Sequence, residues 1–439
     1  MKTVIMAGGL GTRLKKITGD NSPKALAPIG GIPIIEHQIK LLAKYGLKDI
    51  VVSTGYLGEK IHSFCGNGSR WGVNISYSHE AVPIGIAGAI KKLEPKLKEN
   101  FILLNGDLMV EMDLNRLISK HRKHRPLGTL VVHPNEHPYD SYLVEIDDQE
   151  YITNWIPKNN RSLAQYANLT NAGIHIFSPK IFSYILDDHK DLDKEVLPNA
   201  IALGQKILTY RTSEYIKDIG TDDRYHRSNE NFKTGLISSR NLSKPQKAIF
   251  LDRDGTINIF TKGYVTNPNQ MKLIPVSAKA ISKINNSGYL AICVTNQPVI
   301  ARNLCSFDML KKIHNRMETL LGQAGAYLDS IYFCPHHPDK GYPEEIKELK
   351  ITCDCRKPAI GMILKAKEKY NLDLNQSIMI GDTDRDISAA KNAGMKSILV
   401  RSGSPEKYTG PEPDLTCNDL VEAVDYILKQ PPKNMRTRR

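Results

Sequence analysis

Short apolar runs alternate with helix-like segments along the first half of the chain. Four runs have the length and composition of buried strands: Thr3–Ala7, Ile50–Ser53, Asn74–Tyr77 and Phe101–Leu104. After Pro33, apolar residues recur at helical spacing as far as Gly46, where a helix is expected to end. Such an alternation predicts a doubly wound, three-layer α/β/α domain.

The alternation lapses after Asn231 and then resumes. The stretch Lys233–Gln246 is polar and contains a proline. A second series of expected strands follows it, at Lys247–Leu251, Leu290–Thr295, Ser330–Phe333, Ser377–Ile380 and Ser397–Val400. We therefore predict two α/β domains, residues 1–235 and 247–428, with a linker at 236–246 and a basic tail at 429–439.

Length, net charge and cysteine positions limit the kinds of protein that this chain can be. The chain has 439 residues, enough for two separate cores, and its apolar runs are too short for a signal peptide or a membrane span. We therefore expect a soluble, cytoplasmic protein. The net charge of +13 is dispersed apart from the tail, so it suits small phosphorylated substrates better than nucleic acid. Three of the seven cysteines lie within 22 residues, from 334 to 355, which favours a metal over disulfides.

A glycine-rich loop follows the first expected strand. Gly8, Gly9 and Gly11 let the backbone approach a ligand closely, and their N–H groups can form an anion-binding nest. Thr12 and Arg13 continue this loop, and Lys24 follows after a proline, so two cations stand beside the nest. A plain strand-to-helix turn is the alternative interpretation.

The run GGLGTRL…SPKAL resembles the signature of the sugar-1-phosphate nucleotidyltransferases, the GDP-mannose pyrophosphorylases and heptose-1-phosphate guanylyltransferases among them. Further segments match in the same order along the chain: Glu80, the GIAGAI run with Gly88, Asp107 in NGD, Asn171 to Gly173 in NAG, and Asp218 in KDIGT. The resemblance implies a Rossmann-like domain in which a sugar-1-phosphate oxygen attacks the α-phosphorus of a nucleoside triphosphate and pyrophosphate leaves.

The resemblance also implies a role for each matching residue. Arg13 would hold the leaving pyrophosphate, Lys24 the α-phosphate, and Asp107 with Asp218 would bind Mg²⁺. Binding of the nucleotide and the sugar would fall to Gly8, Gly9, Gly11, Thr12, Glu80, Gly88, Lys158, Asn171 and Gly173. The chain departs from the family where a Glu-Lys-Pro segment usually meets the sugar phosphate, because Trp155, Ile156, Pro157 and Lys158 stand there.

A second acidic motif opens the second half. In LDRDGT, Asp252 and Asp254 follow an apolar strand two residues apart, and carboxylates this close need a cation. The arrangement resembles the haloacid dehalogenase superfamily, whose other motifs follow at Thr295, Lys357 and Asp382. This implies a nucleophilic Asp252 that forms an aspartyl-phosphate, an acid–base Asp254, and Thr295 with Lys357 on the phosphoryl oxygens. Mg²⁺ would bind Asp252, Asp382 and the backbone carbonyl of Asp254. Asp386 either orients the site or only caps a helix.

Two cysteine-containing runs lie between these motifs, CPHH at 334–337 and CDC at 353–355. Cys334, His336, Cys353 and Cys355 form a complete tetrahedral set for a structural Zn²⁺, with His337 as an alternative to His336. Zinc would then anchor the loop that presents Arg356 and Lys357. Free buried cysteines are the other interpretation.

This zinc-loop pattern resembles the subgroup that contains heptose 1,7-bisphosphate 7-phosphatase and histidinol phosphatase. Arg302 matches a substrate-phosphate arginine, and Asn296 and Arg356 are further substrate-binding candidates. We therefore predict a bifunctional enzyme that removes the 7-phosphate and transfers a nucleotidyl group, by resemblance GMP from GTP, to the 1-phosphate, toward lipopolysaccharide or another glycan. One alternative is a phosphatase that carries a non-catalytic sugar-nucleotide-binding module. Another is a nucleic-acid 3′-phosphatase.

Overall fold

The computed structural model describes residues 1–9, 17, 19, 21–157, 165–261, 263–339, 341, 344–403 and 408–429. Four predicted site residues, Gly11, Thr12, Arg13 and Lys158, lie outside these ranges, as does the tail beyond Lys429. The chain forms two units. Unit 1 comprises Met1–His133, Tyr142–Pro157 and Leu169–Ser243, and unit 2 comprises Pro134–Ser141, Lys158–Asn168 and Lys244–Arg439.

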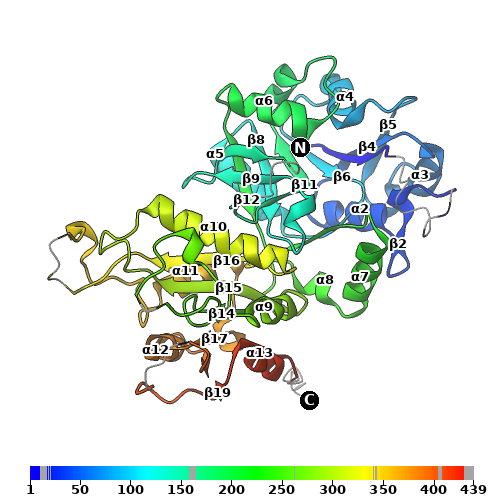
Figure 1. Ribbon diagram of the computed structural model, residues 1–439. Helices are drawn as coiled ribbons and strands as arrows, with labels where there is room; N and C mark the ends of the chain where they lie inside the picture. Colours follow the sequence, from blue (N-terminus) through cyan, green and yellow to red (C-terminus); the bar gives the residue numbers. More distant parts are fainter. Residues whose placement is uncertain are drawn as a thin grey trace. The chain divides into compact units, whose positions relative to one another are not determined.

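Unit 1 is built on a nine-stranded sheet (Figure 1). Its parallel half runs in the order β6, β1, β4, β5, and each strand is one that the sequence predicted: Phe101–Asn105, Thr3–Ala7, Asp49–Thr54 and Asn74–His79. β11 (Thr170–Phe177) pairs antiparallel with β6 and joins a mixed half that the sequence did not predict: β8 (Gly128–His133), β9 (Leu143–Ile146), β10 (Ile152–Ile156) and β12 (Ile207–Arg211). β7 (Leu108–Glu111) and β13 (Tyr215–Asp218) form a separate antiparallel ladder, as do β2 (Pro28–Ile29) and β3 (Ile32–Pro33).

Amphipathic helices pack on the sheet of unit 1. The predicted helix after Pro33 is α2 (Ile34–Lys44), which buries Ile35 and Ile39, and Gly46 follows it with φ +73°. Among the described residues of unit 1, the other α-helices are α3 (Gly58–Cys65), α4 (Gly85–Lys92), α5 (Leu114–His124), α6 (Leu197–Ala202), α7 (Asp222–Lys233) and α8 (Leu236–Ser239). Buried aliphatic residues from β1, β4, β6 and α2 form one continuous core, which fixes the carboxyl ends of the parallel strands.

Unit 2 has a six-stranded, all-parallel sheet in the order β16-β15-β14-β17-β18-β19 (Figure 1). The strands are β14 (Lys247–Leu251), β15 (Tyr289–Asn296), β16 (Ser330–Cys334), β17 (Ile378–Gly381), β18 (Lys396–Val400) and β19 (Leu415–Cys417). The helices are α9 (Ser277–Asn285), α10 (Phe307–Gln323), α11 (Gly361–Tyr370), α12 (Asp384–Asn392) and α13 (Leu420–Lys429). Since parallel sheets are buried on both faces, the near-continuous apolar runs in β14 and β15 explain why the sequence located them.

Two short segments from the first half of the chain fold as part of unit 2. In the second of them, the backbone N–H of Tyr166 donates to Thr319 Oγ1 at 3.1 Å, and that of Asn168 donates to Glu318 Oε2 at 3.3 Å. Both acceptors lie on α10. The domain limits derived from the sequence stay a prediction.

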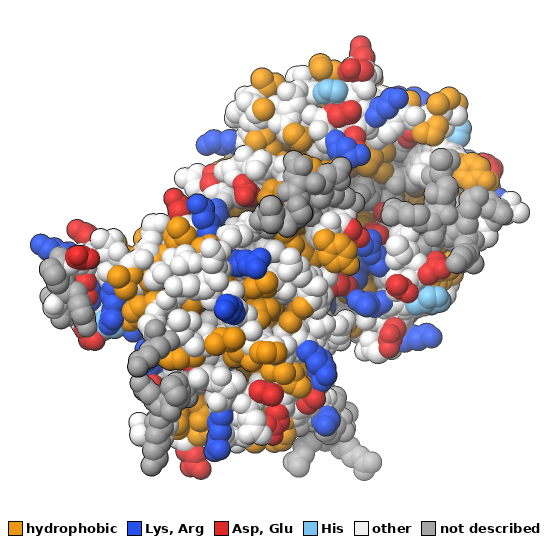
Figure 2. Space-filling view, in the orientation of Figure 1, with side chains coloured by type: hydrophobic (Ala, Val, Ile, Leu, Met, Phe, Trp, Pro, Cys, Tyr) orange, Lys and Arg blue, Asp and Glu red, His pale blue; other side chains and the backbone are white. Residues whose placement is uncertain are grey.

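Figure 2 shows how charged side chains are distributed over one face of the molecule. Figure 2 shows Lys and Arg side chains interspersed with Asp and Glu over the face in view, without one dominant basic patch. Among the described residues, no helix combines the length and the apolar character that crossing a membrane requires.

Candidate active sites

The predicted phosphatase residues converge at the carboxyl edge of the parallel sheet of unit 2. Asp252 directly follows β14, Thr295 and Asn296 end β15, and Asp382 directly follows β17. Because β14 lies between β15 and β17, these three strand ends are neighbours, and this edge is where ligands bind in open α/β sheets.

Lys357 contacts two carboxylates and a backbone carbonyl in this cluster. Its buried ammonium donates to Asp252 Oδ1 at 2.7 Å, to Asp386 Oδ1 at 2.5 Å and to the Val294 carbonyl at 2.7 Å. Burial alone would lower the pKa of Lys357, but the two carboxylates raise it, so the side chain stays charged. The pKa of Asp252, in contrast, is raised by burial. The charge of Lys357 opposes this rise, and the charge of Asp386 adds to it.

The carboxylates around Lys357 fit a divalent cation. Ligand atoms of Asp252, Asp382 and Asp386 all lie within 4.8 Å of one another. Lys357 balances one of the three negative charges, which leaves two for a hard cation with oxygen ligands such as Mg²⁺. A Cβ at Gly255 or Gly403 would approach Asp382 Oδ2 to 2.2 Å, so both glycines are needed to seat that carboxylate.

Asp386 combines the two roles that the sequence left open. Its Oδ2 accepts from the backbone N–H of Thr383 at 3.1 Å and from the Thr383 hydroxyl at 2.7 Å, in a capping box that begins α12. Its Oδ1 accepts from Lys357. Asp386 therefore both caps the helix and positions the lysine.

Asp254 is held by groups that sequence reasoning missed. The guanidinium of Arg253 donates to both Asp254 oxygens, at 2.9 and 2.8 Å, and Gln297 Nε2 donates to Oδ2 at 2.8 Å. Arg253 in turn donates to Nε2 of the buried His314 at 3.2 Å. Burial would raise the pKa of Asp254, but the Arg253 charge and these hydrogen bonds lower it, so the side chain is a carboxylate in this arrangement.

The candidate substrate-binding residues surround the same edge. Asn296 accepts from the Lys357 backbone N–H at 2.9 Å and donates to the Lys357 carbonyl at 3.0 Å, which fixes the loop after the CDC run. The Cζ atom of Arg302 lies over the ring of Tyr264, 5.2 Å from the ring centroid. Arg356 donates to the His336 carbonyl at 3.1 Å.

The predicted zinc ligands meet in one cluster. The Sγ atoms of Cys334, Cys353 and Cys355 lie 3.3 to 3.6 Å apart, and His336 Nδ1 lies 3.7 Å from Cys334 Sγ and 3.3 Å from Cys355 Sγ. A tetrahedral ion with Zn–S bonds of about 2.3 Å has ligand–ligand edges of about 3.8 Å, so this group is close to that size. The group whose ligand atoms come together contains His336 and not His337, whose Nδ1 accepts from the Asp339 backbone.

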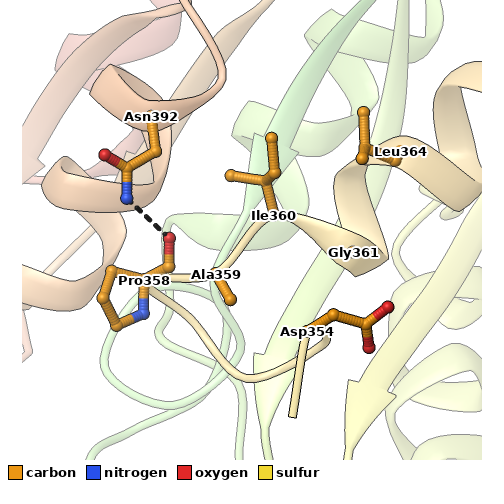
Figure 3. A pocket seen from close by; sticks show the side chains of 7 residues that line it. All are labelled: Asp354, Pro358, Ala359, Ile360, Gly361, Leu364 and Asn392. Atoms are coloured by element: carbon orange, nitrogen blue, oxygen red, sulfur yellow. Dashed lines mark hydrogen bonds between the residues drawn. The ribbon is translucent and has the colours of Figure 1, made fainter.

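A cavity of about 300 Å³ lies beyond the Lys357 loop. Figure 3 shows its lining, with Asn392 Nδ2 donating to the Pro358 carbonyl at 3.0 Å. The lining consists of Asp354, Pro358, Ala359, Ile360, Gly361, Leu364 and Asn392. None of these is a predicted catalytic or ligand residue, and Asp354 is the one ionisable side chain among them.

In unit 1, the described part of the glycine loop lies beside Glu80. A Cβ at Gly8 would lie 3.3 Å from Glu80 Oε1, and a Cβ at Gly55 would approach the Gly8 carbonyl to 2.8 Å. Glu80 is fixed by the Ser53 hydroxyl, which donates to its Oε1 at 2.7 Å. Gly88 lies in α4, one helix further along the chain. The carboxyl ends of β1, β4 and β5 therefore bring the loop and Glu80 together.

The two predicted magnesium ligands of unit 1 lie side by side. The Ile219 N–H, next to Asp218, donates to the Asp107 carbonyl at 3.1 Å. Each carboxylate is paired with a cation: Lys24 Nζ lies 2.5 Å from Asp107 Oδ2, and Arg224 Nη1 donates to both Asp218 oxygens at 2.9 and 2.8 Å. Burial would raise the pKa of Asp218, but Arg224 holds it below its usual value. Carboxylates on neighbouring backbone segments are suitable oxygen ligands for one Mg²⁺ once the two cations shift toward phosphate oxygens.

The NAG segment approaches the end of β6, which leads to Asp107. Gly173 has φ +73°, and a Cβ there would lie 2.5 Å from Asn105 Nδ2, two residues before Asp107. Asn171 Nδ2 donates to Asp193 Oδ1 at 3.0 Å. The sequence did not identify Asp193, which lies in a π-helical turn (Leu192–Val196), or Arg224, which lies in the first turn of α7, because neither belongs to a matching motif.

Comparison with known proteins assigns each half to a family. The family model described as nucleotidyl transferase matches residues 2–235, and one described as HAD-hydrolase-like matches residues 354–423. The chain belongs to the nucleotidyl transferase family and also to a family of HAD-like phosphatases. It therefore combines a nucleotidyltransferase with a phosphatase.

The relatives indicate which kind of phosphatase the second half of the chain resembles. The chain is 41% identical over 185 residues to the D-glycero-beta-D-manno-heptose-1,7-bisphosphate 7-phosphatase of Haemophilus ducreyi, covering 42% of this chain and 98% of that protein. It is 44% identical over 186 residues to the enzyme of the same name from Pasteurella multocida, covering 42% of this chain and 96% of the relative. Among solved structures, HddC from Yersinia pseudotuberculosis, complexed with GMP-PN, is 25% identical, with a TM-score of 0.46 over 53% of this chain and 99% of that one.

Proposed function

We propose that this protein carries out two consecutive steps of nucleotide-activated heptose synthesis. Unit 2 removes the 7-phosphate of D-glycero-D-manno-heptose 1,7-bisphosphate, and unit 1 transfers a nucleotidyl group to the remaining 1-phosphate. The observation that carries the proposal is Lys357, whose ammonium joins Asp252 and Asp386 at the sheet edge. Identity to heptose-bisphosphate phosphatases over nearly their whole length supports the choice of sugar.

In the phosphatase step, a carboxylate oxygen of Asp252 attacks the phosphorus at position 7. The bond from phosphorus to the sugar oxygen breaks, and Asp254 gives that oxygen a proton. Water then attacks the aspartyl-phosphate, Asp254 takes its proton, and inorganic phosphate leaves. Arg253 holds Asp254 ionised, so Asp254 must leave this ion pair before it can carry the proton for the first half of the reaction.

Other groups of unit 2 hold the phosphate during this step. Lys357 and Thr295 bind the phosphoryl oxygens, and Arg302, Arg356 and Asn296 bind the substrate at the entrance. Asp252, Asp382 and the Asp254 carbonyl hold Mg²⁺, which neutralises charge on the transferring group. Zn²⁺ on Cys334, His336, Cys353 and Cys355 fixes the loop before Lys357, because a closed set of four protein ligands is typical of a structural site.

In the transfer step, an oxygen of the heptose 1-phosphate attacks the α-phosphorus of the nucleotide, and the bond to the β-phosphate breaks. Lys24 moves from Asp107 to the α-phosphate, and Arg13 holds the leaving pyrophosphate. Asp107 and Asp218 hold Mg²⁺, which offsets the triphosphate charge. Gly8, Gly9, Gly11 and Thr12 contact the phosphates, Glu80 and Gly88 the base, and Lys158, Asn171 and Gly173 the sugar. Resemblance to GDP-sugar-forming enzymes favours GTP.

This function places the protein in the cytoplasm, where sugar phosphates and nucleoside triphosphates occur, as a supplier of precursors for lipopolysaccharide or related glycans. The domain limits predicted from the sequence, 1–235 and 247–428, would then separate the two activities.

A single set of incubations tests the proposal. The purified protein is given Mg²⁺, heptose 1,7-bisphosphate and each of the four nucleoside triphosphates in turn, and phosphate and pyrophosphate are measured separately. We expect phosphate in every tube and pyrophosphate most rapidly with GTP. Histidinol phosphate serves as the competing phosphatase substrate, and faster phosphate release from it would reject the heptose assignment.

The cation pairs at Asp107 and Asp218 also suit a second function for unit 1, a non-catalytic sugar-nucleotide-binding module. In that case nucleotide sugars would bind, but no sugar 1-phosphate would yield pyrophosphate.

A further inference from the structure

One face of the mixed half of the unit 1 sheet carries an aromatic and amide cluster next to the catalytic candidates. Trp155 pairs with Val144 across β10 and β9, and the Asn171 N–H donates to the Tyr142 carbonyl across β9 and β11. Since side chains two residues apart on a strand share a face, Tyr142, Trp155 and Asn171 lie on the same face. The ring centroids of Tyr142 and Trp155 are 6.4 Å apart.

Trp155 presents a polar atom that is not satisfied within the described part of the chain. The residue is only 9% exposed, and its indole N–H has no hydrogen-bond partner within the described parts of the chain. A buried N–H donor without an acceptor loses its hydrogen bonds to water, so such groups usually serve a ligand or water. This donor stands in the segment where the family's Glu-Lys-Pro run is absent, so the segment itself, from Trp155 to Lys158, has no carboxylate.

Asp193 brings a carboxylate to this cluster from another part of the fold. It lies in a π-helical turn, η8 (Leu192–Val196), and its Oδ1 accepts from Asn171 at 3.0 Å. Single π-helical turns are rare and are often found at functional sites. The chain before this turn is fixed against α4, because the Ala87 N–H donates to the Lys190 carbonyl at 3.1 Å. Asp193 thus lies between the helix that carries Gly88 and the strand that carries Asn171.

The environment of Asp193 is unusual for a carboxylate. Burial, followed by the charge of Asp191, raises the pKa of Asp193 to about 7. A carboxylate is poorly suited to contact phosphate, because the two charges repel each other. The cluster instead matches a sugar. The Asp193 carboxylate can accept hydrogen bonds, the Trp155 N–H can donate one, and aromatic rings lie on the same face, whereas sugar hydroxyls both donate and accept.

We propose that Asp193 and Trp155 determine the sugar specificity of the nucleotidyltransferase: Asp193 accepts, and the Trp155 indole donates, hydrogen bonds to hydroxyls of the sugar 1-phosphate. This inference rests on the proposed function of unit 1 and assigns its sugar contacts. Asp193 supplies from η8 the carboxylate that the segment before β11 lacks. Gly173 and Asn105 connect this face to Asp107, so the sugar would lie next to the transfer site.

Fluorescence gives a readout that does not depend on turnover. The chain has two tryptophans, Trp71 and Trp155, so Trp71→Phe leaves Trp155 as the only indole. Heptose 1-phosphate is titrated into this variant, and GTP with Mg²⁺ is titrated separately. We expect heptose 1-phosphate to change the Trp155 emission saturably. Adding Asp193→Asn should raise the Kd for heptose 1-phosphate about tenfold or more, as for a lost bond to a charged acceptor, with an unchanged Kd for GTP. Asp187→Asn, an exposed carboxylate five residues before Leu192, is the matched control.

A second measurement separates direct contact from a structural effect. Pyrophosphate release is followed with mannose 1-phosphate and its monodeoxy analogues in the wild type, Asp193→Asn and Trp155→Phe. We expect each substitution to raise KM for mannose 1-phosphate more than it lowers kcat, and each penalty to vanish for the one analogue that lacks the contacted hydroxyl. A penalty equal for all analogues, or an unchanged Kd in Asp193→Asn while the wild type turns over, overturns this inference alone. If the wild type neither binds nor uses any sugar 1-phosphate, the proposed function of unit 1 fails as well.

Discussion

The ammonium of Lys357 lies 2.7 Å from Oδ1 of Asp252. This pair orients one oxygen of the proposed nucleophile and leaves a cation where phosphoryl oxygens would arrive. The same ammonium also contacts Asp386, so a positive charge is kept in place by one carboxylate that follows β14 and another in the first turn of α12. The arrangement suits the transfer of a phosphoryl group, in which positioning and charge balance do most of the work.

Replacing Asp252 by asparagine keeps the shape of the side chain but removes the nucleophile. Phosphate release from heptose 1,7-bisphosphate should fall about a thousandfold or more, while pyrophosphate release from heptose 1-phosphate and GTP stays at the wild-type rate. Asp308→Asn, an exposed position at the start of α10, should leave both rates unchanged. Wild-type phosphate release in Asp252→Asn would reject the nucleophile assignment.

Lys24→Ala should have the opposite effect. Without this cation, charge on the α-phosphate is not balanced, so pyrophosphate release should fall at least about a hundredfold, with phosphate release unchanged. Lys40→Ala provides the control, since Lys40 is an exposed lysine paired with Glu36 on α2. Stopped-time assays of the two products decide the outcome, and the assignment is wrong if Lys24→Ala still forms pyrophosphate at the wild-type rate.

Cys353→Ser should reduce bound zinc to well below one per chain and slow the phosphatase, because the metal fixes the loop that leads to Lys357. The measurement is metal content by mass spectrometry on the purified, undialysed protein. Cys417→Ser changes a buried cysteine elsewhere in unit 2 and should retain zinc. A wild-type protein without zinc, or a fully loaded Cys353→Ser, would contradict the site.

The raised pKa of Asp193 makes a prediction about stability. Its pKa is about 7 in the folded chain against about 3.9 when unfolded, so between these values the folded state holds a proton that the unfolded state has lost. The contribution of Asp193 to stability therefore falls as the pH rises from about 4 to about 7. Asp193→Asn removes this cost, and calorimetry should show a Tm gain of a few degrees at pH 8 and little change at pH 4. An equal shift at both pH values would contradict a raised pKa of Asp193 as the cause.

The sequence predicted those parts of the fold that are encoded locally. β1 and β14 were located at their observed limits because strands buried on both faces are continuous apolar runs. The mixed half of the unit 1 sheet was missed, since β8 and β12 are next to each other only through pairing over some 80 residues of chain. The same reason hid the two short segments that fold with unit 2.

The site residues likewise divide into those that the sequence identified and those that only the folded chain shows. The sequence favoured Cys334, His336, Cys353 and Cys355 and kept His337 as an alternative, but only the folded chain shows which imidazole lies beside the three sulfur atoms. The Arg253 contact with Asp254 and the position of Asp193 depend on side-chain direction, which no spacing rule gives.

The central claim is that one chain performs both steps in order, and phosphorus NMR of a single reaction tests it most directly. The wild-type protein is mixed with heptose 1,7-bisphosphate, GTP and Mg²⁺, and the phosphorus signals are followed over time. The account predicts that the 7-phosphate signal disappears as inorganic phosphate grows, after which the 1-phosphate signal is replaced by a sugar diphosphate with release of pyrophosphate. Complete loss of the 7-phosphate with a lasting 1-phosphate signal and no pyrophosphate would contradict it.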